Sequence, residues 1–376
     1  MHDVIVCGAG PAGSMAALLL ARAGVSVLLV DRARFPRDKL CGDTVNPGAV
    51  ALLQRHGLGC VLDDALPVDG MIVTGASGLR VEARYGAGVH GRAILRRDLD
   101  ARLVTAAATA GAQVEESVLV TGAIVDSAAC EPAVRGVRVK GTDPAEIPAR
   151  VVIAADGRHS RVAQALGLSR HPRSPRRWAV GGYFEQVAGL TTYGEMHIRP
   201  DRYMGVAPIG GGIANACVVT AARGGFGNPD ALLLESLRSD PLLADRFAAA
   251  RLVGPTTCLG PLAVECDMPG MDGLLLAGDA AGFIDPMTGD GLRFALRGAE
   301  LAAEAALDAL EHGWRGAHVR LGTARRREFR GKWRFNRALR SIVGSPATQR
   351  LADGGACLAP SLVRGLIRYA ADLRAA

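Results

Sequence analysis

The chain has 376 residues, 49% of them hydrophobic and 22% charged, a composition typical of folded globular proteins that excludes disorder and fibrous repeats. Its length leaves room for two or three domains, and its eight cysteines have neither C-x-x-C nor Cys/His ligand spacing, which excludes a small disulfide scaffold and argues against any metal site. The net charge of +7 comes from one stretch, Arg315 to Arg340, with ten basic residues and one acid.

The N-terminal segment is apolar, but it lacks the basic residues that begin a secretory signal, and Asp3 and three glycines interrupt it. No stretch reaches the roughly 18 uninterrupted apolar residues that a membrane-spanning helix needs. We therefore expect a cytoplasmic protein in a reducing compartment.

The first 31 residues have the pattern of a strand, a glycine-rich turn, a helix and a second strand. An apolar run at 3–7 precedes the turn Gly-Ala-Gly-Pro-Ala-Gly, a helical pattern at 14–23 and an apolar run at 26–30. The first glycine would permit a tight turn, the second would let backbone approach a pyrophosphate, and the third would let the helix pack on the strand. An acid after the second strand is placed to bind a ribose diol. The predicted dinucleotide site comprises Gly8, Gly10, Pro11, Ala12, Gly13, Asp31 and Arg32.

Two later segments repeat the pattern of a buried strand that ends in glycine and an acid. Residues 151–157 read Val-Val-Ile-Ala-Ala-Asp-Gly, and residues 273–279 read Gly-Leu-Leu-Leu-Ala-Gly-Asp, followed by a glycine-containing turn and a helical stretch at 292–311. Ligands of open parallel sheets lie across the carboxyl ends of the strands. We therefore expect one extended ligand across three strand ends.

Together, GAGPAG at 8–13, ADGRHS at 155–160 and LLLAGDAAGFIDPMTGDG at 274–291 resemble the FAD-dependent p-hydroxybenzoate hydroxylase superfamily, over residues 3 to about 345. That superfamily includes aromatic monooxygenases, flavin halogenases and geranylgeranyl reductases. The resemblance implies an α/β protein with a Rossmann-type FAD-binding domain (GR2-like), an antiparallel-sheet substrate domain and C-terminal helices. The implied FAD-binding domain is discontinuous (1–75, 93–170 and 266–312), with a substrate domain at 76–92 and 171–265 and a helical segment at 313–376.

The resemblance also implies roles for individual residues. Asp279, after Gly278, would bind a ribityl hydroxyl of FAD, and Asp156 would serve both FAD and a transient NAD(P)H. Arg96 would contact the flavin nucleotide, unless the register slips by one to Arg97. The turn from Pro286 to Gly291 would direct backbone N–H groups and a helix N-terminus at the flavin, where reduction places negative charge. The residues of this turn assigned to cofactor or catalysis are Pro286, Gly289, Asp290 and Gly291.

Two segments bear on the reaction. The segment Lys39-Leu40-Cys41-Gly42, followed by Asp43, resembles one in geranylgeranyl reductases that places a cysteine near flavin and substrate. Cys41 could deliver a proton while the flavin delivers hydride, or it could be a small buried apolar residue. The segment from Tyr203 to Pro208 lies where those reductases have aromatic residues against the isoprenoid, but glycine and alanine replace two of them here.

Short apolar runs between about 176 and 265 alternate with glycine-rich turns, which predicts an antiparallel sheet that roofs the substrate. Within it His197 and Glu195 are either substrate contacts or core and surface positions. The basic stretch at 315–340 predicts a solvated helix face packed on the substrate domain, with weak contact to a membrane surface as the alternative and no nucleic-acid role. A short C-terminal helix follows at 360–373, and the chain is expected to be a monomer or homodimer.

The leading expectation for function is an oxygen- and NAD(P)H-dependent monooxygenase that hydroxylates an apolar phenolic or polyketide-like small molecule of secondary metabolism. The alternative is reduction of a carbon–carbon double bond in a prenyl or quinone-like lipid. Cys41 favours the reductase, as does Ala163, where hydroxylases commonly have an arginine. The single GxGxxG motif indicates that NAD(P)H binds only transiently or that a partner supplies the electrons. A non-enzymatic redox-sensing module is a third hypothesis.

Overall fold

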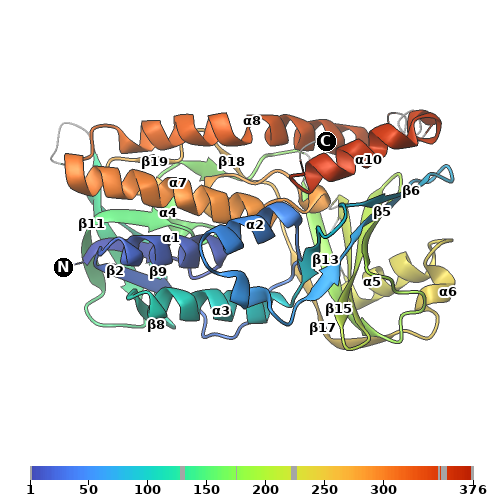
Figure 1. Cartoon of the computed structure of the whole chain (residues 1–376). Helices are drawn as coiled ribbons and strands as arrows, with labels where there is room; N and C mark the ends of the chain where they lie inside the picture. The colour runs from blue at the N-terminus through green and yellow to red at the C-terminus, as the bar shows by residue number, and fades with distance from the viewer. Residues whose placement is uncertain are drawn as a thin grey trace.

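A mostly parallel sheet forms the centre of the nucleotide-binding part (Figure 1). The computed structural model describes residues 2–127, 132–174, 176–221, 227–345, 348 and 354–373. The strand order is β19-β20-β11-β1-β2-β8, parallel from β20 to β8, with β19 antiparallel at the edge. The apolar run of β1 pairs on both sides, so that Val4 lies opposite Val27 and Val151. The strand bounds are β1 His2–Cys7, β2 Val27–Asp31, β8 Gln113–Glu116, β11 Glu146–Ala154, β19 Gly270–Met271 and β20 Leu274–Leu276.

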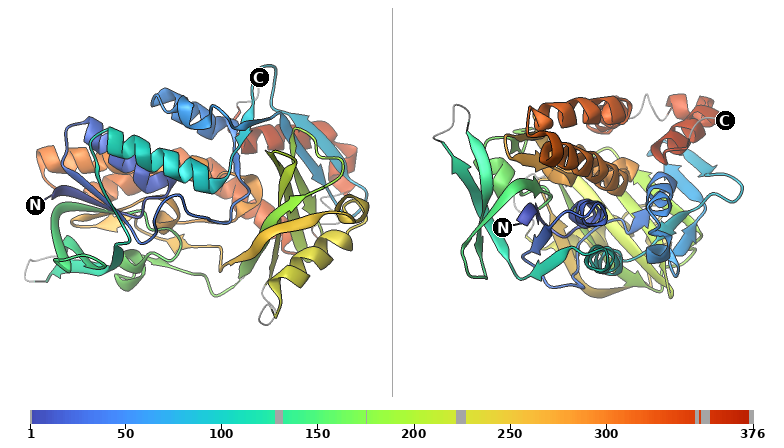
Figure 2. Two further views of the ribbon diagram at one scale, coloured as in Figure 1. Left: turned by 90° about the horizontal axis from the view of Figure 1, so that it is seen from below. Right: turned by 60° about the vertical axis from the view of Figure 1, so that its left-hand side comes forward.

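Helices cover one face of this sheet, and a β hairpin with a short helix covers the other (Figure 2). In Figure 1, α8, α7 and α1 lie as successive layers. The other face packs against the antiparallel pair β9–β10 and α4. The bounds are α1 Pro11–Arg22, α2 Pro47–Arg55, α3 Arg96–Thr109, α4 Arg161–Ala165, α7 Gly291–His312, α8 Ala317–Val343, β9 Leu119–Asp126 and β10 Ala133–Lys140.

A second sheet of seven strands, in the order β17-β13-β16-β15-β14-β5-β6, forms the part that the sequence predicts to bind substrate, and we call it the substrate sheet. It is antiparallel except where β14 pairs with β5. Helices α5 and α6 cover its outer face, where Phe184 and Phe247 meet edge to face at 5.3 Å. The bounds are β5 Gly70–Thr74, β6 Arg80–Arg84, β13 Arg177–Glu185, β14 Tyr193–Ile198, β15 Arg202–Gly210, β16 Ile213–Ala221, β17 Arg251–Leu259, α5 Pro229–Arg238 and α6 Ala244–Phe247.

Smaller elements lie outside the two large sheets. They are the three-stranded sheet β3-β7-β4, the pair β12-β18 and, among the described residues, three 3₁₀ turns. The expected fold class is confirmed, but β5 falls inside the segment 1–75 that the sequence assigned to the FAD-binding domain. It belongs to the substrate sheet because Tyr193–His197 pair with residues 70–74. The bounds are β3 Thr44–Val45, β4 Leu66–Val68, β7 Gly91–Ala93, β12 Ser169–Arg170, β18 Glu265–Cys266, η1 Gly59–Leu62, η2 Gly278–Ala281 and η3 Pro286–Thr288.

The C-terminal helices extend from one part to the other. Helix α8 packs on α7, and α10 (Pro360–Ala370) packs on β6. The basic stretch divides between the interior and solvent: Arg325 and Lys332 of α8 are buried, whereas most of its other arginines are exposed. Among the described helices, none is both long and apolar enough to cross a bilayer.

Candidate active site

The glycine-rich turn between β1 and α1 needs its glycines for different geometric reasons. Gly8 has φ +96°, a conformation that L side chains rarely adopt. A Cβ on Gly13 would lie 1.7 Å from the carbonyl oxygen of Gly8, because α1 approaches the turn this closely. A Cβ on Gly10 would lie 3.7 Å from a flexible Arg37 nitrogen, and Gly10 lines the cavity described below. Helix α1 begins there without a side-chain cap, which leaves its first N–H groups available to a phosphate.

The acid after β2 lies against this turn. The carboxylate of Asp31 accepts hydrogen bonds from the backbone N–H groups of Ala9 at 2.7 Å and Ala33 at 2.8 Å. A carboxylate has about four acceptor positions, so two of them remain for a ribose. Asp31 and the exposed Arg32 do not line the cavity, and their contact with a nucleotide stays a prediction.

The other two strand ends meet β1 at the same edge of the sheet. Cys7 pairs with Ala154 of β11, which in turn pairs with Leu276 of β20. After these strands, Gly157, Arg158, Gly278 and Asp279 line the cavity, whereas Asp156 does not. The Asp156 carboxylate instead accepts the N–H of Arg161 at 3.1 Å, and burial raises its pKa, with Asp31 adding to the shift.

The turn before α7 is held by side chains from the substrate sheet. Asp285 caps the 3₁₀ turn by accepting the N–H of Met287, and it also accepts the Tyr203 hydroxyl at 2.5 Å and Arg177 at 3.1 Å. Tyr203 therefore lines the cavity with its ring while its hydroxyl fixes the turn. Gly289 then takes the left-handed conformation, with φ +66°, and α7 begins at Gly291.

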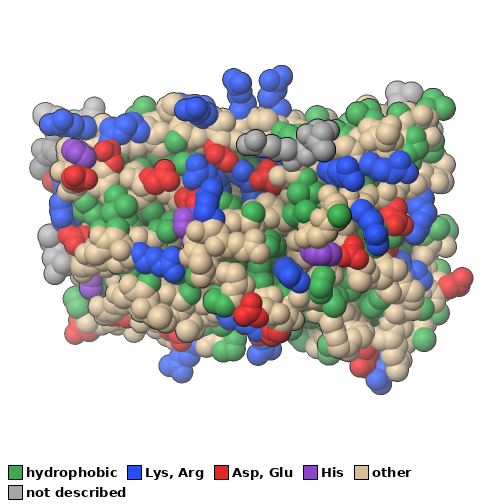
Figure 3. All heavy atoms as spheres, viewed as in Figure 1, with side chains coloured by type: hydrophobic (Ala, Val, Ile, Leu, Met, Phe, Trp, Pro, Cys, Tyr) green, Lys and Arg blue, Asp and Glu red, His purple; other side chains and the backbone are tan. Residues whose placement is uncertain are grey.

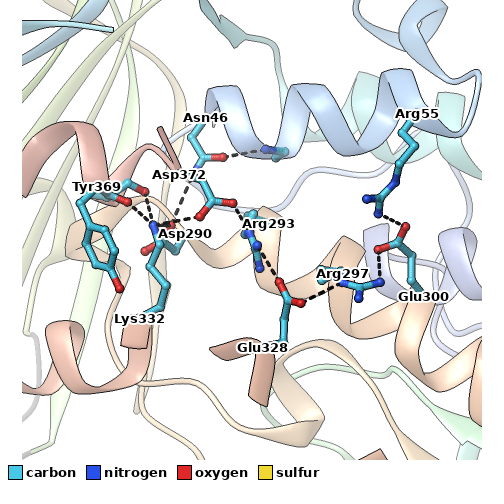
Figure 4. A network of polar contacts seen from close by, with 12 residues as sticks. Asn46, Arg55, Asp290, Arg293, Arg297, Glu300, Glu328, Lys332, Tyr369 and Asp372 are labelled. Carbon is cyan, nitrogen blue, oxygen red and sulfur yellow. Dashed lines mark hydrogen bonds and ion pairs between the residues drawn. The ribbon is translucent and has the colours of Figure 1, made fainter. Parts of the chain in front are cut away.

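A buried cation ties the same turn to the C-terminal helix. The ammonium group of Lys332 donates to Asp290 at 3.3 Å and to the backbone carbonyls of Tyr369 and Ala370, and it forms an ion pair with Asp372 at 3.5 Å (Figure 4). Asn46 also donates to Asp290 at 3.3 Å. Burial raises the pKa of Asp290 to about 6, against the opposing effect of Lys332. The position of α10 is thus coupled to the turn before α7.

The network continues along α7 (Figure 4). Arg293 binds Asp372 and Glu328, and Arg297 binds Glu328 and Glu300. Glu300 also pairs with Arg55 of α2. These contacts fix α2, α7 and α8 to one another beside the site.

One continuous cavity of about 670 Å³ runs from the nucleotide turn to the C-terminal helix. Its wall passes from Gly10 and Asp279, through Gly289 and Gly291, to the inner face of the substrate sheet. Beyond the turn the lining is almost wholly apolar. The apolar end is formed by Met71, Val73, Leu79, Phe335, Leu339, Leu362 and Ile367, among others.

Cys41 lies in the cavity wall beside a fixed cation. Arg96 holds Asp100 through two hydrogen bonds of 2.8 Å, and both side chains are buried. Burial lowers the pKa of Arg96, but Asp100 and the Cys41 sulfur raise it by more, so that its pKa lies above the ordinary value. Because Cys41 is partly accessible and lines the cavity, the position is not a closed apolar core site.

Two further cations complete the nucleotide end of the cavity. Lys39 and Arg158 line it together with Arg96, whereas Arg97 is exposed. Burial and the charge of Arg96 together lower the pKa of Lys39 to about 8, against the opposing effect of Asp279. A polyanion placed among these groups would stabilise the charged form of the lysine.

Asp43 lies behind the cavity wall, bound on all sides. Its carboxylate accepts the Tyr183 hydroxyl at 2.8 Å, the Asn215 amide at 2.7 Å and the backbone N–H of Arg96 at 3.0 Å. Asn215 also donates to the carbonyl of Cys41 at 2.9 Å. Burial nevertheless raises the pKa of Asp43 to about 6. These hydrogen bonds fix the backbone at Cys41, through its carbonyl, and at Arg96, through its N–H.

Three residues assigned to the substrate pocket are not in the cavity wall. His197 is on the outer face of β14, where it binds Glu195 at 2.9 Å and Thr74 at 2.9 Å. Pro208 follows the cavity-lining Ala207 in β15, so its side chain points to the opposite face, where it is buried away from the cavity. Asp43 is withdrawn into the cluster described above. In the strands, side chains alternate between faces, so neighbours of pocket residues point away from it.

The residues present fit FAD. A pyrophosphate needs free N–H groups and cations, and the uncapped α1 N-terminus faces a cavity end that carries Lys39, Arg96 and Arg158. A ribityl chain needs a hydrogen-bond acceptor near the strand end, which Asp279 provides. An isoalloxazine ring needs an open backbone turn, and a Cβ placed on Gly289 would meet nothing within 4 Å beyond its chain neighbours. Sequence reasoning missed Lys39, Arg158, Arg177 and Lys332, of which Lys39 and Arg158 are in quoted motifs.

Comparisons with known proteins agree with this geometry. A family model described as "FAD binding domain" matches residues 1–224. The chain is 33% identical over 317 residues to a menaquinone reductase of Mycobacterium tuberculosis, covering 80% of this chain and 76% of the relative. It is 34% identical over 330 residues to digeranylgeranylglycerophospholipid reductase 1 of Methanopyrus kandleri, covering 82% of this chain and 81% of the relative.

Solved structures share the fold. The flavin-dependent brominase Bmp2 superposes with a TM-score of 0.84 at 21% identity, covering 98% of this chain and 93% of that chain. A geranylgeranyl bacteriochlorophyll reductase-like protein from Thermoplasma acidophilum superposes with a TM-score of 0.80 at 23% identity, covering 93% and 89%. At these identities the likeness establishes the fold and leaves the reaction open.

Proposed function

The chain belongs to this family of FAD-binding oxidoreductases, and on that premise we propose that it reduces a carbon–carbon double bond in an apolar, prenylated or quinone-like lipid. The observation that carries the proposal is the continuous cavity, which extends past the turn at Gly289 as an apolar passage to α10. A small phenol would need neither this length nor this lining. The reductase names of the two relatives support the same chemistry.

When bound and reduced, FAD would supply a hydride to one carbon of the double bond. The other carbon needs a proton, and Cys41 holds one at its sulfur in the cavity wall. The guanidinium of Arg96, whose pKa the Cys41 sulfur raises, lies beside that sulfur. Asn215 and Asp43 hold the backbone of this segment, so that the sulfur keeps its place relative to the substrate.

Hydroxylation, the leading expectation from sequence, stays a prediction. It shares the cofactor and the cavity, and it differs in requiring oxygen and in needing no thiol proton donor. A transient NAD(P)H donor is proposed for either reaction. Between the two reactions, the apolar length of the cavity and the position of Cys41 support reduction.

The experiment compares the two reactions directly. The FAD-loaded chain is mixed with a detergent-dispersed isoprenoid quinone and a chemical reductant, with and without oxygen, and the product is analysed by mass spectrometry. We expect a product whose prenyl side chain has gained two hydrogens, which fragmentation distinguishes from a quinol ring, and which forms equally well without oxygen. The Cys41→Ser variant should form this product about 10²-fold more slowly or worse. A product with one additional oxygen, absent under anaerobic conditions, would instead establish the hydroxylase.

A further inference from the structure

Helix α10 exposes an apolar stripe to solvent. Leu362, Leu366 and Tyr369 are 64%, 38% and 40% exposed, and Leu358, just before the helix, is 89% exposed. The spacing of four and three residues places Leu362, Leu366 and Tyr369 on one side of α10, and Leu358 precedes the helix at the same end of the chain segment. The neighbouring side of α10, with Val363 and Ile367, is already packed on the β5–β6 hairpin. The stripe is therefore additional to what α10 needs for its own packing.

The stripe lies where the cavity reaches the surface. Leu362 and Leu366 both line the cavity and are exposed, which only residues at an opening can be. Across from them, Phe335 and Leu339 of α8 line the same cavity, and Phe335 meets Tyr369 edge to face at 5.2 Å. The opening is thus bounded by α8 on one side and α10 on the other.

The α8 side of this opening is strongly basic. Its single acid between 315 and 340, Glu328, is paired with Arg293 and Arg297 of α7. Figure 3 shows Lys and Arg side chains along the upper edge, where α8 runs. On α10, Arg364 and Arg368 are also exposed, although each donates to a β6 carbonyl. The exposed arginines of α8 are Arg320, Arg326, Arg327, Arg330, Arg334 and Arg337.

We propose that this α8–α10 face, the stripe Leu358, Leu362, Leu366 and Tyr369 together with the exposed arginines of α8, docks on an anionic lipid bilayer. Apolar side chains beside a row of arginines suit insertion at the boundary between acyl chains and anionic headgroups. A second copy of the chain fits less well, since it would bring a second set of arginines to the same face. In the docked protein the cavity would open directly into the lipid, from which a lipid substrate would enter it. This inference on substrate entry rests on the proposed function.

Vesicle flotation tests the docking. The full FAD-loaded chain is mixed with vesicles of phosphatidylglycerol and phosphatidylcholine, or of phosphatidylcholine alone. We expect flotation with the anionic vesicles and its loss at about 1 M NaCl, where the Debye length is about 3 Å. Leu358→Glu/Leu362→Glu should lower the partition constant about tenfold per leucine. Arg330→Gln/Arg334→Gln should lower it about fivefold per arginine.

Leu242→Glu is the matched control, since Leu242 is 49% exposed beside α6 on the far side of the substrate sheet. It should float like the unchanged chain. The docking proposal is overturned if the unchanged chain stays in solution, if the control and the double leucine variant float equally, or if sedimentation shows that the stripe joins two copies. Reduction of detergent-dispersed lipid is measured in parallel, so a failed function and a failed docking face are told apart.

Discussion

Replacing Lys332 by methionine should destabilise the junction between α10 and the turn before α7. Lys332 and Asp290 are 5% and 1% exposed, and the ammonium group also satisfies two backbone carbonyls and Asp372. Removing one partner of a buried ion pair costs about 3–5 kcal/mol. Because burial already raises the pKa of Asp290 to about 6, this carboxyl can become neutral once the lysine is lost. We therefore expect the lower end, about 3 kcal/mol near neutral pH.

Urea denaturation of the variant measures this loss, and flavin fluorescence measures the FAD released. Lys332→Met/Asp290→Asn should be more stable than the single variant, because no buried carboxylate is left without its cation. Arg330→Met, at an exposed position of the same helix, should change the free energy of unfolding by no more than about 0.5 kcal/mol. A Lys332→Met protein within about 1 kcal/mol of the unchanged chain, with FAD retained, would refute the proposed coupling.

Three further predictions follow from the site. Asp279→Ala should lose most bound FAD, measured as flavin absorbance after gel filtration, whereas unchanged retention would contradict the ribityl role. Gly13→Ala should fail to bind FAD or to fold, since its Cβ would lie 1.7 Å from a carbonyl oxygen, while Gly10→Ala should fold normally by circular dichroism. The pKa of Asp43 is about 6 in the folded chain against 3.8 for the ordinary carboxyl, so the folded state binds the extra proton between these values. Its contribution to stability should thus fall by about 3 kcal/mol as pH rises from about 4 to about 6, and a pH titration of urea midpoints should show a smaller fall for Asp43→Asn.

The nucleotide-binding half could be predicted from sequence because its signals are local. The turn from Gly8 to Gly13 follows the apolar strand β1 and leads into α1, and the apolar strand β2 comes after the helix, so strand, turn and helix were identified within one short segment. The same holds for the strand ends at Asp156 and Asp279. In each case the backbone geometry requires a residue type that a single sequence displays.

The pocket residues could not be assigned because their positions depend on distant segments. His197 and Met196 are neighbours in β14, and only the packing of α5 and α6 on one face determines which of them faces the cavity. Asp43 is withdrawn by Tyr183 and Asn215, which lie 140 and 172 residues further along the chain. A period of two identifies the two faces of a strand without stating which is the inner one.

Lys332 shows the same limit in a helix. Within the basic stretch it looks like the neighbouring arginines, and its burial depends on the carbonyls of Tyr369 and Ala370 together with Asp290. The parallel pairing of β5 with β14 likewise joins segments more than a hundred residues apart. Such pairings determine where the domain boundary falls.

Anaerobic single turnover tests the central claim most directly. The chain is loaded with FAD, reduced chemically, freed of excess reductant and mixed with a polyprenyl quinone without oxygen, while the flavin absorbance is followed. The proposed function predicts that the oxidised flavin spectrum returns as one double bond per flavin gains two hydrogens. A flavin that stays reduced until oxygen is admitted, and then yields an oxygenated product, would contradict it.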